Sequence, residues 1–241
     1  NQELPEAPIV MDLKQEPVIG IRGKDEERDN YLRTLMLDLA VHHPYTRLRF
    51  FLLGERKDAE MLRVSRLLPH LWCPAVETFA IACSEEGASR LQEYLYQWLC
   101  EREKESVHTD HAVIFVLNDR SFRVHPVFRF VQKAAALGVS FFFFCGPDEL
   151  PPPGCLVQID LMNETVGLKG MGKIRRTNKA QQTDWFSWDL LPLVRWQVLC
   201  ELMAPARIPE ISLGESLPRQ LTLTELLTLS SGKPGTALVR W

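Results

Sequence analysis

The sequence predicts an α/β fold in which a mostly parallel sheet is covered by helices on both faces. Short, nearly continuous apolar runs alternate along the chain with longer segments of helical periodicity. Strands buried on both faces read as such runs, and alternation of strands with helices is typical of parallel sheets. The composition supports a folded domain, because 46% of the 241 residues are hydrophobic and 24% are charged.

The first predicted strand covers residues 18–21, and a helix over residues 25–42 follows it. The apolar residues of this helix recur at the spacing of one helical face: Tyr31, Leu32, Leu35, Met36, Leu39 and Ala40. Pro44 enforces the end of the helix. Residues 1–16 form a lead-in rich in Pro and Glu, in which residues 9–13 are predicted as a short strand.

The middle of the chain continues the same alternation. Its apolar runs are predicted as five further strands, at residues 48–53, 78–83, 112–117, 139–145 and 156–161. Ser84 is a good N-cap for a long helix that runs to about residue 104. A second helix is predicted over residues 127–137, and Gly138 stops it.

The last third of the chain has a different character. Residues 167–179 read as a glycine-rich, basic loop, and residues 184–203 as an amphipathic helix that carries Trp185, Trp188 and Trp196. Four prolines interrupt residues 204–241, with one short helical stretch near residues 223–229. We therefore predict three parts: a lead-in (1–16), a core (17–166), and a C-terminal tail (167–241) of basic loop, Trp-rich helix and linker.

Charge and cysteine usage exclude several classes of protein. The net charge of −3 gives no overall electrostatic footprint for nucleic acid. The six cysteines include no C-x-x-C pair, so we expect reduced core thiols rather than disulfides or a zinc site. The longest apolar run, residues 139–145, is too short to span a membrane. The chain begins with Asn1, and we expect it to be part of a longer protein.

The loop after the first predicted strand resembles a phosphate-binding loop. Its position fits a ligand site, because parallel sheets bind ligands at the carboxyl ends of their strands. The loop reads Gly20-Ile21-Arg22-Gly23-Lys24-Asp25-Glu26-Glu27. A working P-loop, G-x-x-x-x-G-K-[ST], needs a longer loop and a hydroxyl for Mg²⁺, whereas Asp25 follows Lys24 here. The carboxylates at residues 25–27 complement the positive end of the helix dipole, where a phosphate would otherwise bind. A well-capped helix is thus favoured over an ATP site, although Lys24 retains the charge for a weak phosphate contact.

The strand at residues 112–117 ends in a way that resembles a Walker B motif. In that motif one carboxylate organises Mg²⁺ and a following Glu polarises water. Asn118 falls at the metal-binding position and Asp119 at the catalytic one; a register one residue later leaves Arg120 at the catalytic position. Either way one acid remains instead of two. The alternative interpretation is a strand followed by a turn.

Three other groups of residues are candidate sites. Lys169, Lys173, Arg175, Arg176 and Lys179 share an acid-free stretch, which indicates a solvated loop or a basic partner surface before a phosphate or nucleic-acid contact. The histidines at 108, 111 and 125 flank a strand without sharing a helix face, which disfavours zinc. The tryptophans at 185, 188 and 196 are more typical of a core or an interface than of base stacking.

The order of these features resembles the core of FtsK/SpoIIIE-type ATPases. Successive landmarks are the degenerate Gly loop, Arg47-Leu-Arg-Phe-Phe-Leu-Leu-Gly54, Leu67-Leu68-Pro69-His70-Leu71, the long helix ending in Cys100-Glu-Arg-Glu103, the Walker-B-like strand, and Ala134-Ala-Ala-Leu-Gly-Val-Ser-Phe-Phe-Phe-Phe-Cys-Gly146. Within that superfamily the chain looks closest to the EssC/EccC membrane ATPases of type VII (ESX/WXG-type) secretion systems. The matching segment is the divergent domain before the first P-loop domain, and Leu150-Pro-Pro-Pro-Gly-Cys155, Ile208-Pro209 and Arg240-Trp241 match its later landmarks.

The resemblance implies a RecA-like (P-loop NTPase-like) three-layer sandwich followed by a helical and extended tail. It implies a cytoplasmic domain of an inner (plasma) membrane protein, whose full-length form is a hexameric secretion motor. Its partners would be the other domains of the same ATPase and the membrane components of the secretion system, with nucleic acid not expected.

Of the family's P-loop only Gly20, Gly23 and Lys24 are partly matched, and Asp25 breaks the pattern. We therefore expect a degenerate, non-hydrolysing scaffold or regulator with no cofactor assigned. Three alternatives stay open: a weakly hydrolysing Mg·ATP-binding domain that uses Lys24 and Asp119, a DNA translocase module, and an unrelated Rossmann-like interaction domain.

Overall fold

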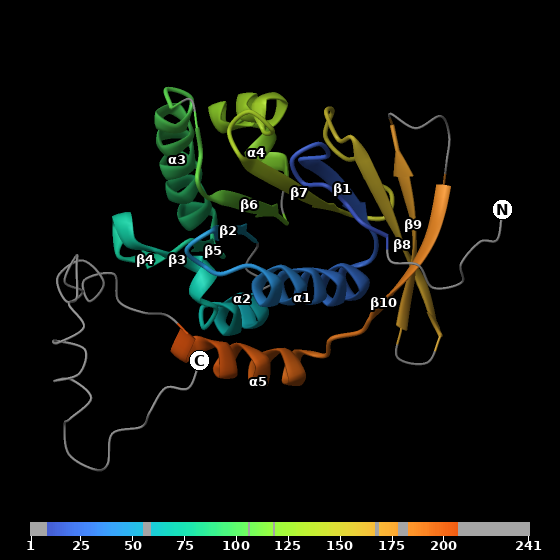
Figure 1. The fold of residues 1–241 in the computed structure, drawn as a ribbon. Coiled ribbons are helices and arrows are strands. Elements are labelled where there is room, and N and C mark those ends of the chain that lie inside the picture. Colours follow the sequence, from blue (N-terminus) through green and yellow to red (C-terminus); the bar gives the residue numbers. More distant parts are fainter. Residues whose placement is uncertain are drawn as a thin grey trace, which may run out of the picture. The chain divides into compact units, whose positions relative to one another are not determined.

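The computed structural model (Figure 1) describes residues 9–54, 59–105, 107–117, 119–166, 169–177 and 183–206. At positions 59, 76, 119 and 163–166 the description covers the backbone alone. The chain divides into two units after Ala206, and the described residues all belong to the first of them. The predicted helical stretch near residues 223–229 therefore lies outside the described residues.

The described residues form an eight-stranded sheet in the order β10-β9-β8-β1-β7-β6-β2-β5. The strands are β1 (Val18–Arg22), β2 (Leu48–Leu53), β5 (Ile81–Ala82), β6 (His111–Val116), β7 (Val139–Cys145), β8 (Val157–Val166), β9 (Lys169–Arg176) and β10 (Thr183–Asp189). From β8 to β5 all neighbours are parallel, while β9 and β10 continue the sheet in antiparallel pairing. The predicted α/β fold with a mostly parallel sheet is confirmed.

Helices cover both faces of the parallel part of the sheet (Figure 1). On one side lie α1 (Asp25–His42), α2 (Ala59–Ser65) and α5 (Leu193–Met203). On the other lie α3 (Glu85–Arg102), α4 (Asp119–Val124) and the 3₁₀ segment η4 (Pro126–Lys133). Two separate hydrophobic cores result, one on each face.

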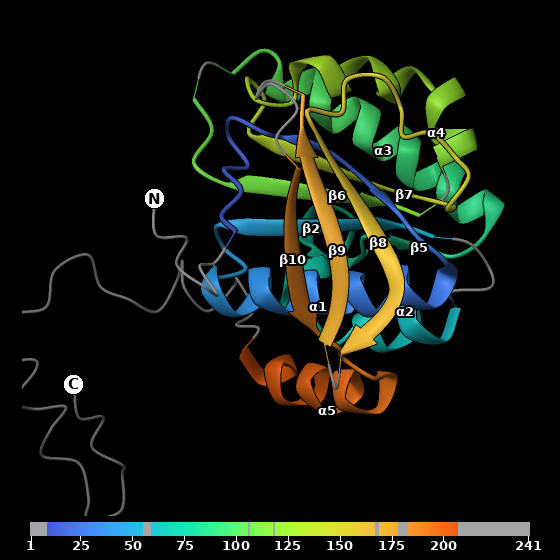
Figure 2. The ribbon, with the colours of Figure 1, turned by 90° about the vertical axis from the view of Figure 1, so that its right-hand side faces the viewer.

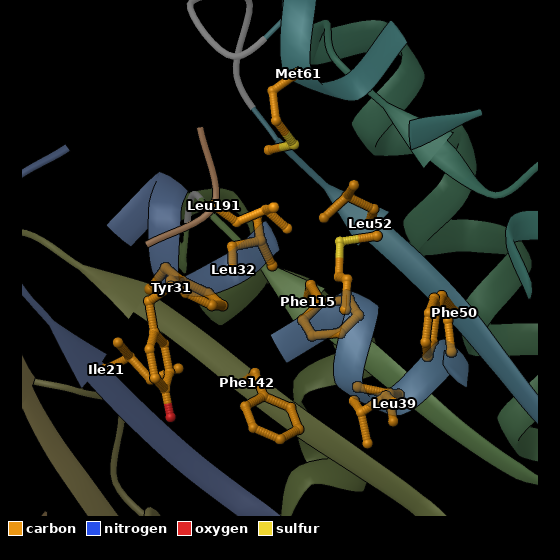
Figure 3. Packing of buried hydrophobic residues seen from close by; sticks show 14 of the residues in the cluster. Ile21, Tyr31, Leu32, Leu39, Phe50, Leu52, Met61, Phe115, Phe142 and Leu191 are labelled. Atoms are coloured by element: carbon orange, nitrogen blue, oxygen red, sulfur yellow. The ribbon is translucent and has the colours of Figure 1, made fainter. Parts of the chain in front are cut away.

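The run of apolar residues in β7 supplies both cores at once, because successive side chains of a strand point to opposite faces. Phe142 and Phe144 belong to the core beneath α1, whereas Phe141 and Phe143 belong to the core beneath α3 and α4. Figure 3 shows Phe142 packed with Ile21, Leu32 and other residues of the first core. A continuous apolar strand is thus what a sheet covered on both faces requires.

The predicted strand at residues 78–83 is divided into two short strands. β4 (Thr78–Phe79) pairs with β3 (Trp72–Cys73), which follows the 3₁₀ turn η2 (Pro69–Leu71), whereas β5 pairs with β2. Ala80 separates them: its N–H donates to Leu71 O and its carbonyl accepts from Leu52 N–H. A further 3₁₀ turn, η3 (Pro74–Val76), links β3 to β4.

The expected basic loop at residues 167–179 is wrong where the structure describes it, since residues 169–176 form β9. Glycine here makes room for aromatic rings. A Cβ added to Gly170 would lie 2.3 Å from the ring of Trp188, and one added to Gly172 would lie 2.7 Å from Phe186. The glycine-rich composition suggested a loop. The reason for the glycines is not visible in the local sequence, because the rings that fill the space beside them come from another strand, β10.

The expected helix over residues 184–203 is also wrong in its first half. Residues 183–189 form β10, in which Phe186 and Trp188 point toward Tyr31 of α1. The helix α5 begins only after Pro192, and a short 3₁₀ turn, η5 (Ala204–Ala206), follows it. The period-2 alternation of aromatic residues was the signal for a strand.

Two smaller expectations also differ. Residues 9–13 pair with no strand among the described residues, because the chain turns at Asp12, whose carbonyl accepts the N–H groups of Gln15 and Glu16. The helix expected over residues 127–137 is a 3₁₀ segment up to Lys133 followed by turns, and α4 before it was not expected. Gly138 does end this region, with a left-handed φ of 62° that favours glycine.

Candidate functional site

The loop that resembles a phosphate-binding loop lies at the carboxyl edge of the parallel strands. Gly20 lies within β1, and Lys24 is the N-cap residue of α1. The end of β6 lies at the same edge, two strands from β1, because β7 runs between them. With strands about 4.8 Å apart, roughly 10 Å separates β1 from β6. Asn118 lies outside the described residues, and Asp119 is the first residue of α4.

Both glycines of this loop are buried beneath side chains of the chain itself. A Cβ on Gly20 would lie 2.4 Å from Pro151 Cβ and 3.3 Å from Cys155 Sγ. A Cβ on Gly23 would lie 2.9 Å from Leu161 Cβ. Real Cβ contacts almost never fall below 3.0 Å, so each position requires glycine for packing. The volume that a bare glycine leaves is filled by these side chains.

The backbone of the loop continues the sheet rather than curling around a ligand. Neither Gly20 nor Gly23 has a positive φ. The N–H of Gly23 donates to the carbonyl of Cys145 in β7, with an N···O distance of 3.3 Å. In a phosphate-binding loop the backbone N–H groups point at the phosphates. Here this donor is used in the contact with β7.

The first turn of α1 holds both acids and a fixed cation. Asp25, Glu26 and Glu27 occupy it, as the sequence indicates. Arg28 forms an ion pair with Asp25, and its Nη1 donates to the carbonyl of Phe144 at 3.4 Å. Its side chain is only 12% exposed. A guanidinium therefore lies between the start of α1 and the end of β7.

Hydrogen bonds and an ion pair hold the segment between β7 and β8 against the carboxyl edge of the sheet. Glu149 Oε2 accepts the N–H of Gly146 at 2.8 Å, and its other oxygen lies 3.5 Å from Arg120 Nη2. The backbone hydrogen bond from Gly146 lowers the pKa of Glu149, with help from the charges of Arg120 and Arg28 and against partial burial. Arg123 Nη2 donates to the carbonyl of Leu150 at 2.8 Å, which leads directly to Pro151 on Gly20.

These residues do not fit the triphosphate and Mg²⁺ of a nucleotide. Pro151 and Leu161 cover the glycines, and the carboxylate of Glu149 accepts a hydrogen bond from the N–H of Gly146, just after β7. The acids in the first turn of α1 complement its dipole and repel an anion. Pro151, Leu161, Arg28 and Glu149 were not identified from the sequence. The Asp25–Arg28 spacing was visible there, but the contacts of Pro151 and Leu161 depend on the fold.

The other residues weighed from the sequence are distributed through the structure. His111 Nε2 contacts Ser140 Oγ at 2.9 Å, and His125 Nδ1 accepts the N–H of Val127. Within the described ranges, no group of three or more His, Cys, Asp or Glu side chains is arranged to hold a metal ion. Trp188 and Trp196 are buried, whereas Trp185 is 57% exposed.

The basic residues of β9 divide between the two faces of the sheet. Arg176 is buried against Glu16, with an N···O distance of 2.8 Å, and lies 3.6 Å from Asp184. Lys173 and Arg175 lie on the opposite face, and Lys179 lies outside the described residues. A basic cluster predicted as one loop is thus separated by strand alternation.

A hollow of about 760 Å³ lies at the opposite, amino edge of the strands. The lead-in residues 9–14 form one wall, and Leu48 and His111, which begin β2 and β6, line another. It therefore does not coincide with the glycine loop at residues 20–27. No helix in the part of the chain that the structure describes is both long enough and apolar enough to cross a bilayer.

Comparison with known proteins identifies relatives of one kind. No family model matches the chain. The type VII secretion system protein EssC of Staphylococcus aureus (strain MSSA476) is 23% identical over 178 residues, which cover 68% of this chain and 12% of the relative. The EssC protein of strain MW2 gives the same values. The chain thus spans about an eighth of the length of these relatives.

Solved structures with a similar fold include ATPase domains of EssC and EccC. EssC (ATPases 2 and 3) from Geobacillus thermodenitrificans has a TM-score of 0.54 and 13% identity over 90% of this chain and 49% of that one. EccC (ATPases 2 and 3) from Thermomonospora curvata, solved with a signal sequence peptide, has a TM-score of 0.60 and 12% identity over 81% of this chain and 44% of that one. The resemblance to EssC/EccC ATPases that the motif order indicates is confirmed, and the fold is that of their ATPase domains.

Proposed function

We propose that this chain is a degenerate, non-hydrolysing ATPase-like domain of a type VII protein secretion motor, acting as a scaffold or regulator. In this role it links the membrane anchor of the motor to the domains that hydrolyse ATP. The proposal combines the EssC/EccC likeness with a carboxyl edge whose residues do not accept a nucleotide.

The observation that carries the proposal is the packing of Pro151 on Gly20. In-line attack by water on a γ-phosphate requires positioned charge and a metal ion, and both depend on a loop that wraps the phosphates. In this chain the surface of that loop contacts Pro151 and Leu161, 2.4 Å and 2.9 Å from the Cβ positions of the two glycines. The fold is that of an ATPase domain, while side chains pack against the glycines that would otherwise face a ligand.

The arrangement of the longer protein is part of the same proposal. Residues 1–16 would lead in from the membrane side, residues 17–166 would form the core, and residues 167–241 would lead to the next ATPase domain. Its partners are the other domains of the same ATPase and membrane components of the secretion system. The full-length protein is a hexamer anchored in the inner (plasma) membrane, and this chain is one of its cytoplasmic domains. Relatives that are much longer than this chain support the placement.

Calorimetric titration of the chain with Mg·ATP tests the proposal. We expect no saturable binding up to about 1 mM, a range in which even a binding free energy of about −4 kcal/mol would be detected. An EssC or EccC ATPase domain with an intact P-loop serves as the positive control. Micromolar binding, together with hydrolysis that Asp119→Asn abolishes and Lys24→Ala weakens, would instead establish the weakly active ATPase.

A further inference from the structure

One face of the antiparallel extension of the sheet carries no helix among the described residues. In β8, β9 and β10, alternate side chains pack toward α1, and the others point away from it. Figure 2 views the three strands from that second side, with α1 behind them. We call this the outer face; its residues that matter below are Arg22, Asp160, Lys169, Met171, Lys173, Arg175, Trp185 and Asp189.

Four residues of the outer face form one row across four strands. The strand registers place Arg22 beside Asp160, Asp160 beside Lys173, and Lys173 beside Trp185. Asp160 is held from both sides, by Arg22 at 2.5 Å and by Arg175 at 2.8 Å. Lys173 Nζ lies 4.2 Å from the centroid of the Trp185 ring. The row is therefore built in advance, with its side chains fixed by cross-strand contacts.

The charge of the outer face is opposite to that of the chain. Four cations, Arg22, Lys169, Lys173 and Arg175, and two carboxylates, Asp160 and Asp189, leave a surplus of two positive charges, whereas the whole chain carries −3. Asp160 accepts hydrogen bonds from the guanidinium groups of Arg22 and Arg175. The ammonium of Lys173 and the other N–H groups of the half-exposed Arg175 can therefore donate to a further anion.

Trp185 is 57% exposed, whereas every other Phe, Trp and Tyr side chain in the described part of the chain is partly or fully buried. Tryptophan, methionine and arginine are the side chains enriched at the centres of protein interfaces, while isolated charges are depleted there. Met171 lies on the same face of the neighbouring strand β9. An apolar anchor is thus flanked by cations on a rigid sheet.

We propose that the outer face binds an acidic protein segment that carries apolar side chains. The segment's carboxylates would pair with Lys173 and Arg175, and its apolar side chains would cover Trp185 and Met171. Single-stranded nucleic acid is disfavoured because successive bases need several stacking platforms, whereas this face offers one ring and a carboxylate beside it. The inference does not depend on whether the domain binds ATP.

The test uses the whole chain and a synthetic peptide of about 15 residues in which Glu alternates with Leu and Phe. Titration by calorimetry gives the affinity, and backbone amide shifts in NMR spectra locate the contact. We expect binding with a Kd in the micromolar range, with shifts concentrated in β8, β9 and β10. Arg175→Gln and Trp185→Ala should each weaken it about tenfold, equivalent to about 1.4 kcal/mol.

Matched variants on other surfaces act as controls. Arg90→Gln removes a cation whose side chain is 80% exposed on α3, and Leu202→Ala removes an apolar side chain that is 72% exposed on α5. Both should bind the peptide as the parent chain does. The same peptide with Lys in place of Glu should not bind.

Several outcomes would overturn the proposal. They are absence of saturable peptide binding up to about 1 mM, equal weakening by the control variants, or equal binding of the Lys peptide. Tighter, salt-sensitive binding of an oligo-dT strand that Arg175→Gln abolishes would assign the face to nucleic acid. Self-association in sedimentation that Trp185→Ala removes would assign it to a second copy of the chain.

Discussion

Substitution of Gly20 by Ala separates a packing role for this glycine from a phosphate-binding role. The new Cβ would lie 2.4 Å from Pro151 Cβ and 2.7 Å from Pro151 Cγ, and neither atom belongs to a flexible chain end. Overpacking of this kind costs about 1–3 kcal/mol. Alanine regains about 0.5–1 kcal/mol relative to glycine within a strand. We therefore expect Gly20→Ala to reduce the free energy of unfolding by about 1–2 kcal/mol.

The partner variant Pro151→Gly removes both atoms that the new Cβ would meet. It carries a cost of its own, about 1 kcal/mol, because the unfolded chain gains freedom. In the Pro151→Gly background, however, Gly20→Ala should cost nothing or should stabilise. The double-mutant cycle should thus show a coupling energy of about 1–3 kcal/mol, the overpacking cost itself, measured by urea unfolding followed by circular dichroism.

Gly87→Ala is the matched control, since its Cβ would meet only the Ser84 hydroxyl at 3.1 Å and ordinary contacts beyond. It lies in the first turn of α3 and should leave stability unchanged or slightly raised. The reasoning is refuted if Gly20→Ala costs the same with and without Pro151, or if it leaves stability unchanged and alters only ATP binding.

Two further predictions concern the buried polar and aromatic groups. Burial, followed by the charges of Arg102 and Lys14, lowers the pKa of His111 to about 4 in the folded chain. In the unfolded chain the imidazole is protonated near its ordinary pKa of about 6.5, so acid favours the unfolded state. Stability should therefore fall by about 1–2 kcal/mol between pH 7 and pH 5, and His111→Gln should remove that loss in urea unfolding at both pH values, whereas an unchanged pH slope would contradict the assignment. Trp196 is fully buried in α5 and donates to Ser65 Oγ at 3.2 Å, so Trp196→Ala should cost about 3–5 kcal/mol in thermal unfolding. Val194→Ala, on the exposed side of the same helix, should cost less than about 0.5 kcal/mol, and equal losses would show that α5 does not pack as described.

The parallel part of the sheet was predictable because burial on both faces leaves a direct mark on the sequence. The apolar run of β7 and the helix Asp25–His42 were predicted with the bounds that the structure shows. The glycine loop and the acid that begins α4 were also placed correctly at the carboxyl edge of strands. In each case the signal is local, a run of one residue type or a residue at a strand end.

The extension β9–β10 and the filled glycine loop depend on contacts between distant residues. Gly170 and Gly172 look like loop residues until the rings of Trp188 and Phe186 are placed over them. Likewise Gly20 looks like part of a phosphate loop until Pro151 is placed on it. Glycine spacing alone does not distinguish space kept for a ligand from space filled by a side chain, since both require the absence of a Cβ.

The position of β1 in the sheet has a consequence for the order in which the chain folds. β1 is the first strand of the described sheet to be synthesised, yet its two neighbours are β7 and β8, which are made more than a hundred residues later. Until Val157 and the residues after it are synthesised, the backbone N–H and C=O groups on that edge of β1 lack their β8 partners. Such long-range pairing slows folding and leaves the nascent chain prone to aggregation unless chaperones protect it. A chain truncated before β8 should therefore fail to fold, because β1 lacks one of its two neighbours.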